Sequence, residues 1–209
     1  MKNFRLFSIM MGCLAVLMTA SCNKTEDNTK EQQEKWEQWL KELQAEITAM
    51  HGDYEGYIYY QKASNSQDAD SVAARWSVIN DSTIMLTNMP TELIARKISD
   101  SQPELKQALL DAGTIDVTVQ VGYNYYMRSP IAFYLYPKSV QLTLPISGTP
   151  NKVVINFYNY NENTNTLGQF LVSTGEILFD LYPQTVTVEG QVRASFYQDA
   201  ILNYYGKKK

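Results

Sequence analysis

The chain has 209 residues, of which 44% are hydrophobic, 19% charged and 12% aromatic, a composition typical of a globular protein rather than a disordered or collagen-like one. It carries 18 basic and 22 acidic residues, a net charge of −4, which disfavours binding to nucleic acid or another polyanion. Both cysteines, Cys13 and Cys22, lie near the start, so the chain beyond them has no thiol for redox or zinc–cysteine chemistry.

The first 21 residues have the pattern of a secretory signal peptide that is removed after export. Lys2 and Arg5 form its charged start, and residues 6–18 are largely apolar but too few to remain as a membrane span. Small residues then lead to Cys22. This ending resembles a bacterial lipoprotein signal, in which the cysteine is acylated and becomes the new N-terminus.

Acylation of Cys22 predicts attachment to the membrane, because two or three acyl chains such as palmitate anchor a protein durably. Lys24, Glu26 and Asp27 resemble the export signal that sends lipoproteins of Bacteroidota to the outer face of the outer membrane. We therefore expect a lipid-anchored outer-membrane protein, displayed at the cell surface, with residues 22–30 as a polar tether. Two alternatives stay open: a plain signal peptide with an unmodified Cys22, and a tether whose charges carry no export signal.

A helix is predicted over residues 31–50, with a capping box that starts at Thr29. Gly52 is a natural stop for this helix. We expect its apolar stripe to pack against the domain that follows, whereas the alternative, a helix lying on the membrane, would favour a basic polar face that is absent here. The stripe recurs at three- and four-residue steps: Trp36, Trp39, Leu40, Leu43, Ile47 and Met50.

From residue 53 onward, apolar and polar residues alternate, as in strands with one face in water. Ten such runs predict a mainly β fold, an antiparallel β-sandwich or barrel, in a single domain over residues 31–209 that includes the N-terminal helix. The predicted strands are 54–61, 71–79, 83–87, 114–121, 131–136, 139–144, 152–160, 169–173, 176–181 and 184–192.

One helical insertion interrupts the strands. Ser101 is a candidate N-cap, Pro103 suits a first turn, and Gly113 closes the stripe that begins at Leu105. Residues 90–98 fit either a helical turn or the end of a strand. The terminal Lys207, Lys208 and Lys209 are expected to form a frayed, solvated end.

No residue pattern predicts a catalytic or metal site, and no cofactor is expected. His51 is the only histidine, and the dipole of the preceding helix explains a positive side chain at that position. A hydrolase with paired carboxylates stays open as a third possibility. Its candidate acids are Asp116, Glu162, Glu176, Asp180, Glu189 and Asp199.

Tyrosine is the strongest compositional feature of the chain: it has 15 tyrosines, and eight of them lie in three predicted strands, 54–61, 131–136 and 152–160. Because a tyrosine ring combines an apolar face with a polar tip, these strands suit contact with a glycan or a partner protein. Tyrosine is also a good strand former that covers the outer face of a sheet, so a purely structural role stays open. The candidate contact residues are Tyr54, Tyr57, Tyr59, Tyr123, Tyr125 and Tyr134.

Two resemblances bear on function. The opening at residues 52–56, the segment Trp76-Ser77-Val78 with the following 81–83, and the amphipathic strands resemble small uncharacterised lipoproteins of gut Bacteroidota, classed as domains of unknown function. The Gly-x-Tyr-x-Gly opening is also similar to calycin-like lipoproteins, whose barrels hold small apolar ligands. The resulting expectation is a non-catalytic envelope module that binds a glycan or partner protein; the alternative is a calycin-like carrier.

Overall fold

The computed structural model describes residues 26–61, 69–160, 167–196 and 200–209, with only the backbone for 26–29 and 125–128. The expected signal and Cys22 lie outside the described residues. The chain divides into two compact units, residues 1–43 and 44–209. None of the helices in the described ranges has the length and apolar character needed to cross a membrane.

Helix α2 spans Glu26–Ala49 and so begins before the predicted cap at Thr29. Two tryptophans of its apolar stripe, Trp36 and Trp39, stack with ring centroids 4.7 Å apart, and Trp36 is half exposed. At the other end of the helix Ile47 is buried, as is Met50 just beyond it.

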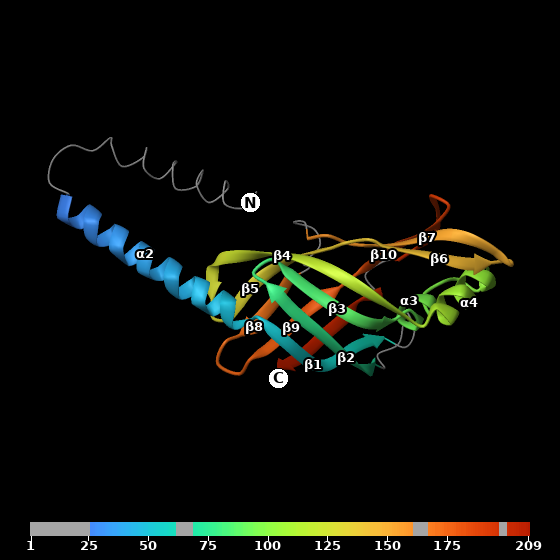
Figure 1. Cartoon of the computed structure of the whole chain (residues 1–209), viewed down its shortest axis with the longest axis horizontal. Coiled ribbons are helices and arrows are strands. Elements are labelled where there is room, and N and C mark those ends of the chain that lie inside the picture. Colours follow the sequence, from blue (N-terminus) through green and yellow to red (C-terminus); the bar gives the residue numbers. More distant parts are fainter. Residues whose placement is uncertain (1–25, 62–68, 161–166, 197–199) are drawn as a thin grey trace. The chain divides into compact units, whose positions relative to one another are not determined.

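The predicted β fold is confirmed: antiparallel strands form a closed barrel of eight strands and a second sheet of four (Figure 1). In order around the barrel the strands are β1 (Gly52–Gln61), β12 (Leu202–Lys208), β9 (Glu176–Leu181), β8 (Leu167–Leu171), β5 (Ile131–Pro137), β4 (Thr114–Arg128), β3 (Thr83–Pro90) and β2 (Ala69–Asn80). The second sheet runs β11 (Gln191–Ser195), β10 (Pro183–Val188), β7 (Thr149–Phe157) and β6 (Val140–Ile146).

Each of the ten predicted strands overlaps an observed one. The run 184–192 is two strands, β10 and β11, because Glu189 and Gly190 both adopt positive φ angles (49° and 78°) and turn the chain back. The prediction of a frayed C-terminus is wrong. Strand β12 pairs with β1 on one side and β9 on the other, and thereby closes the barrel.

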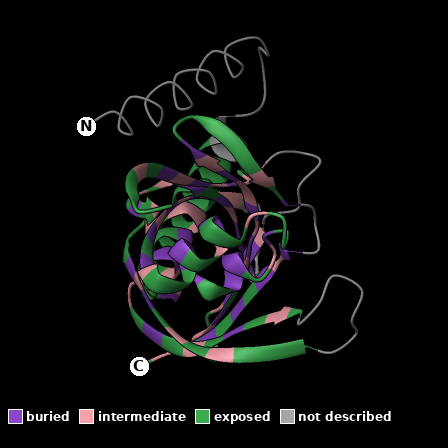
Figure 2. Ribbon diagram, turned by 90° about the vertical axis from the view of Figure 1, so that its right-hand side faces the viewer, coloured by how far each residue is buried: buried purple, intermediate pink, exposed green. Residues whose placement is uncertain are grey.

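Helices α3 (Glu92–Ala95) and α4 (Pro103–Ala112) form the insertion between β3 and β4. They lie at one end of the barrel, beside the second sheet, and Figure 2 looks onto this end. The buried Thr91 hydroxyl is within hydrogen-bonding distance of the carbonyl oxygens of Leu109 (2.5 Å) and Gly113 (3.0 Å). Gly113, with φ 74°, ends α4 as predicted.

The opposite end of the barrel is covered by the last turns of α2. Gln44 and His51 both hydrogen-bond Asp81 in the β2–β3 turn, at 2.8 and 2.7 Å. The Lys208 ammonium group donates to the carbonyl oxygen of Ala49 at 2.8 Å and so caps the helix from β12. Because Met50 is fully buried beneath these contacts, apolar side chains close this end of the barrel.

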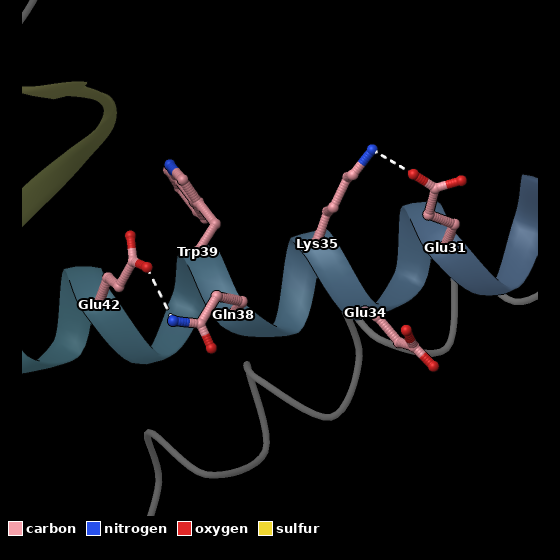
Figure 3. A pocket seen from close by; sticks show the side chains of 6 residues that line it. All are labelled: Glu31, Glu34, Lys35, Gln38, Trp39 and Glu42. Carbon is pink, nitrogen blue, oxygen red and sulfur yellow. Dashed lines mark hydrogen bonds and ion pairs between the residues drawn. The ribbon is translucent and has the colours of Figure 1, made fainter.

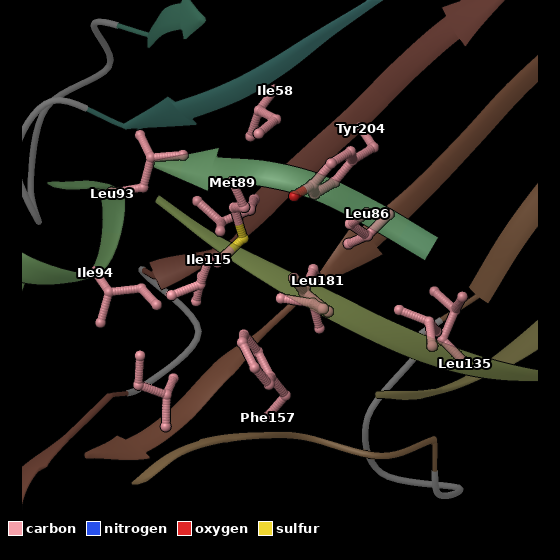
Figure 4. Close-up of a cluster of buried hydrophobic side chains, with 14 of the residues drawn as sticks. Ile58, Leu86, Met89, Leu93, Ile94, Ile115, Leu135, Phe157, Leu181 and Tyr204 are labelled. Carbon is pink, nitrogen blue, oxygen red and sulfur yellow. The ribbon is translucent and has the colours of Figure 1, made fainter. Parts of the chain in front are cut away.

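Aromatic rings fill the interior of the barrel. The Trp76 indole stacks parallel to Tyr54 at 6.0 Å and meets the edges of Phe179 and Tyr204 at 5.7 and 5.6 Å. Gly206 makes room for Trp76, because a Cβ at this position would collide with the indole. Figure 4 shows Tyr204 in the adjoining apolar cluster with Leu86, Met89 and Leu181.

Candidate functional site

Alternation along β1 divides its tyrosines between the two faces of the barrel wall. Tyr54 points inward with no exposed surface, and its hydroxyl donates to the Met50 carbonyl at 2.7 Å. Tyr57 and Tyr59 point outward and are 49% and 39% exposed. Tyr54 therefore belongs to the core and is withdrawn from the contact residues, because a ring packed on Trp76 presents no face to an external ligand.

Strands β12 and β9 extend the outward surface of β1. Tyr57 pairs across the strands with Tyr205, which pairs in turn with Leu178. One row further along, Tyr59 pairs with Asn203, and Asn203 pairs with Asp180. Directly paired side chains lie side by side on one face of a sheet, so these residues form one continuous surface. We call it the tyrosine face: Tyr57, Tyr59, Leu178, Asp180, Asn203 and Tyr205.

The rings of the tyrosine face stand clear of their neighbours on one flank. Tyr57 and Tyr59 lie with ring centroids 6.2 Å apart at an interplanar angle of 47°. On β2, their directly paired neighbours are the small Ala73 and Ser71. Tyr205 and Leu178 are each 38% exposed. Because the paired side chains on the β2 flank are small, they leave Tyr57 and Tyr59 open to a ligand from that side.

The polar part of the tyrosine face centres on Asp180. The Asn203 side-chain amide donates to Asp180 Oδ1 at 2.6 Å, and the Tyr182 hydroxyl donates to Oδ2 at a long 3.4 Å. Burial raises the pKa of the Asp180 carboxyl above its ordinary value, and these two hydrogen bonds only partly oppose that shift. Burial likewise raises the pKa of Tyr182, and the neighbouring Asp180 charge adds to the shift.

Charged residues border the tyrosine face, and both acids of this border have hydrogen-bond partners. Glu55 accepts from Lys209 at 2.6 Å and from Arg75 at 3.1 Å, and Lys209 followed by Arg75 lowers its pKa. The Tyr205 hydroxyl donates to Glu176 at 2.9 Å. Hydrogen bonds from Thr174 and Tyr205 lower the pKa of Glu176. Glu55 is thus paired with two cations, whereas Glu176 holds the hydroxyl of Tyr205, a member of the tyrosine face.

The remaining predicted contact residues do not join the tyrosine face. Tyr123 is partly buried, packs against the core and meets Phe133 edge-on at 6.4 Å. Tyr134 packs on Tyr160 at a centroid distance of 4.1 Å, on another part of the barrel wall. The side chain of Tyr125 lies outside the described residues. Of the five predicted residues whose side chains are described, the structure brings together Tyr57 and Tyr59 on this surface.

Sequence reasoning missed four members of the tyrosine face. Asn203 and Tyr205 lie beyond the last predicted strand, which ended at residue 192. The alternation of the buried Leu202, Tyr204 and Gly206 with outward residues could have signalled a further strand there. Leu178 and Asp180 lie on the polar side of a correctly predicted strand. Their place beside β1 depends on a pairing that skips most of the chain.

No serine or threonine hydroxyl in the described part of the chain forms a hydrogen bond with the His51 side chain. His51 Nε2 lies 2.7 Å from Asp81, whereas the Ser77 hydroxyl donates to a different acid, Asp53, at 2.6 Å. No group of three or more histidine, cysteine, aspartate and glutamate side chains in the described ranges is placed to hold a metal ion.

The acids proposed for a hydrolase have structural partners where they are described. Asp116 accepts the Asn88 backbone amide at 2.9 Å, and Glu189 accepts that of Lys152 at 2.5 Å. Glu162 and Asp199 lie outside the described residues. The arrangement therefore supports binding better than acid–base chemistry.

Two of the surface hollows differ from the tyrosine face in the residues that line them. One follows α2, and Figure 3 shows that polar side chains pair along the helix there, Lys35 with Glu31 at 2.6 Å and Gln38 with Glu42 at 2.8 Å. The other lies between Glu46, the 129–130 turn and residues 171–173. Neither hollow is lined by a residue of the tyrosine face, and neither brings together residues with an evident shared chemistry.

Comparison with protein families matches residues 49–188 to a family described as a domain of unknown function, DUF4840. No curated protein and no solved structure matches the chain. The matched segment covers two thirds of the chain and includes strands β1 to β10, but not β11 or the barrel-closing β12. The chain belongs to this uncharacterised family, DUF4840.

Proposed function

We propose that the protein is a non-catalytic binding module of the cell envelope, anchored in the outer membrane by acyl chains on Cys22, and that its tyrosine face binds a glycan at the cell surface. The observation that carries the proposal is the set of three exposed tyrosines, Tyr57, Tyr59 and Tyr205, on adjacent strands beside Asn203 and Asp180. Aromatic faces stack on the apolar faces of sugar rings, while amides and carboxylates bind their hydroxyl groups.

The size of the surface favours a glycan over a protein partner. An aromatic side chain can bury about 150–250 Å², so three tyrosines and a leucine that are partly exposed offer roughly 300–400 Å² of contact. A standard protein interface buries about 800 Å² on each partner. Because this area is small and the bordering Glu55 is already paired with Lys209 and Arg75, the tyrosine face suits a few sugar rings better than a broad protein surface.

The rigidity of the site is a second support. The tyrosine face lies on paired strands of a closed barrel, so its side chains are held in position before a ligand arrives. Preorganisation lowers the entropy cost of binding. A weakly bound ligand such as an oligosaccharide benefits most from this saving.

A carrier of a small apolar ligand is the second candidate, and the closed eight-stranded barrel is the observation in its favour. Two features count against it. Stacked rings around Trp76 occupy the interior, residues 44–49 of α2 contact the barrel at one end, and α3 with α4 lie at the other. A carrier needs an apolar cavity that encloses most of its ligand.

A glycan array with the full-length protein in detergent tests the proposal. We expect the triple substitution Tyr57→Thr, Tyr59→Thr and Tyr205→Thr to weaken binding at least tenfold, because each stacking ring contributes about 0.5–1.5 kcal/mol. Threonine preserves strand propensity. The matched control is Tyr136→Thr, an equally exposed tyrosine on β5, which should bind as the wild type does.

The contrary outcomes of the array experiment are equally clear. Absence of binding to every glycan, or equal binding by the triple variant, refutes the glycan proposal. Tyrosine-dependent capture of an envelope protein instead of a glycan would replace it with a protein partner. The anchor has a separate test, since Cys22→Ala should abolish incorporation of a labelled fatty acid, and unchanged labelling refutes acylation.

A further inference from the structure

The row Tyr59, Asn203 and Asp180 places one ring and two polar side chains on three neighbouring strands. Neighbouring strands lie about 4.7–4.9 Å apart. The spacing between the Tyr59 ring, the Asn203 amide and the Asp180 carboxylate is therefore close to the width of one sugar ring. A sugar whose face rests on Tyr59 therefore directs its edge toward Asn203 and Asp180.

The hydrogen bond between Asn203 and Asp180 fixes the chemistry of this edge. An ionised carboxylate only accepts hydrogen bonds, so the Asn203 NH₂ group must face Asp180 Oδ1, at 2.6 Å. The amide oxygen of Asn203 then points to the other side. Asp180 Oδ2 receives only the long 3.4 Å contact from Tyr182. Two oxygens on adjacent strands, Asn203 Oδ1 and Asp180 Oδ2, can therefore accept hydrogen bonds from two hydroxyl groups of a sugar.

The negative charge of Asp180 at this edge is not balanced by a cation of the described residues. Among the described residues, the hydrogen-bond partners of Asp180 are Asn203 and Tyr182, which are both uncharged. No lysine or arginine in the described part of the chain forms an ion pair with Asp180. By contrast, Glu55 in the border has both Lys209 and Arg75. A half-buried carboxylate without a cation repels a second anion brought beside it.

We propose that Asp180 and Asn203 form the subsite that selects the ligand of the tyrosine face: a neutral sugar that donates two adjacent hydroxyl groups to these side chains while its ring stacks on Tyr59. The subsite rejects sugars that bring a carboxylate beside Asp180, such as uronic acids, in which the C6 hydroxymethyl group is oxidised to a carboxylate. This inference rests on the proposed glycan binding and names the class of sugar.

The test uses glucose- and galactose-based oligosaccharides and the same sugars oxidised at C6 to uronic acids. We expect the full-length wild type to bind the neutral sugars at least tenfold more tightly than the oxidised ones. Asp180→Asn retains an acceptor for Asn203 but removes the charge. It should weaken neutral binding about tenfold, because hydrogen bonds to charged groups are the stronger ones, and should reduce the discrimination.

The matched control is Asp53→Asn, the same change at an exposed acid of β1 outside the row. It should leave both affinity and discrimination at the wild-type level. The subsite is refuted if Asp180→Asn behaves like Asp53→Asn, or if the wild type binds oxidised and neutral sugars equally, while the triple tyrosine variant still loses binding. If the wild type binds no sugar, the proposed function itself fails, and the subsite fails with it.

Discussion

The inner and outer faces of the β1–β12 pair carry the same residue type in opposite roles. Inside the barrel, Tyr54 and Tyr204 are fully enclosed and pack on Trp76. Outside, Tyr57, Tyr59 and Tyr205 expose between 38% and 49% of their surface. The difference shows that strand position, not residue type, decides whether a tyrosine serves stability or contact.

The inner tyrosines also differ from each other. The Tyr54 hydroxyl reaches the Met50 carbonyl, whereas that of Tyr204 is buried with no hydrogen-bond partner among the described residues. The Trp76 indole nitrogen has none among them either. Burial raises the pKa of both tyrosine hydroxyls far above the ordinary value. Inside the barrel the tyrosine ring stabilises the fold by packing, whereas the buried hydroxyl costs free energy unless it donates a hydrogen bond to an acceptor.

The largest effect should come from removing the central ring of the interior. Trp76→Ala should lower the free energy of unfolding by about 3–5 kcal/mol, because it leaves a large cavity among Tyr54, Phe179 and Tyr204. Urea denaturation measures the change. Trp36→Ala, at a half-exposed position on α2, is the control and should cost no more than about 0.5 kcal/mol. Equal costs at both positions would contradict the packed interior.

The hydroxyls of the two inner tyrosines should respond in opposite directions. Tyr54→Phe should lose about 1 kcal/mol, because it removes a buried hydrogen bond to Met50. Tyr204→Phe should gain about 1 kcal/mol, because it removes a buried oxygen that has no partner among the described residues. Thermal unfolding of both variants under the same conditions measures these changes in the free energy of unfolding. A loss of similar size in both would mean that Tyr204 has an acceptor after all.

The half-buried carboxylate of the tyrosine face should show itself in the pH dependence of stability. Since the pKa of Asp180 is raised in the folded state, that state holds its proton to higher pH than the unfolded chain does. Stability therefore falls as pH rises from about the ordinary value, 3.8, through the raised pKa, and the contribution is constant above it. The melting temperature of Asp180→Asn relative to wild type should rise across this window. A difference that is flat, or that falls with pH, would contradict the raised pKa.

The smallest effect on stability is expected on the outer face. Tyr57→Thr and Tyr59→Thr should each change the free energy of unfolding by no more than about 0.5 kcal/mol, because both rings lie at the surface and threonine suits a strand. Chemical denaturation of each single variant measures this. A loss as large as that of Trp76→Ala would make these rings structural and leave the tyrosine face without a separate role.

Local patterns carried most of the fold prediction. Alternation placed all ten predicted strands, and Gly113 marked the end of α4 through its positive φ. Two local predictions failed. The helix predicted to be capped at Ser101 starts at Pro103 after Gln102. Of the end predicted to fray, Lys207 and Lys208 belong to β12, because they pair with Glu55 and Tyr54 of β1.

The candidate site was only partly predictable. Tyr57 and Tyr59 were identified from composition, but Tyr54 was assigned to the same surface although it is one strand position out of phase with them. Residue 54 is an odd number of positions from residues 57 and 59, so its side chain points to the opposite face of the strand. Alternation alone could therefore have separated Tyr54 from Tyr57 and Tyr59. The partners Tyr205, Asn203 and Asp180 were beyond reach, since they join β1 only through closure of the barrel.

The sequence by itself determined the strand-forming segments, their turns and which residues of each strand share a face, because these depend on neighbours a few positions apart. Only the tertiary structure decided that β12 lies between β1 and β9, a pairing that joins residue 57 to residue 205. Such a pairing depends on how the whole interior packs around Trp76 and Gly206, and a shift of one residue in its register would turn Tyr205 inward. The tyrosine face is thus a product of barrel closure.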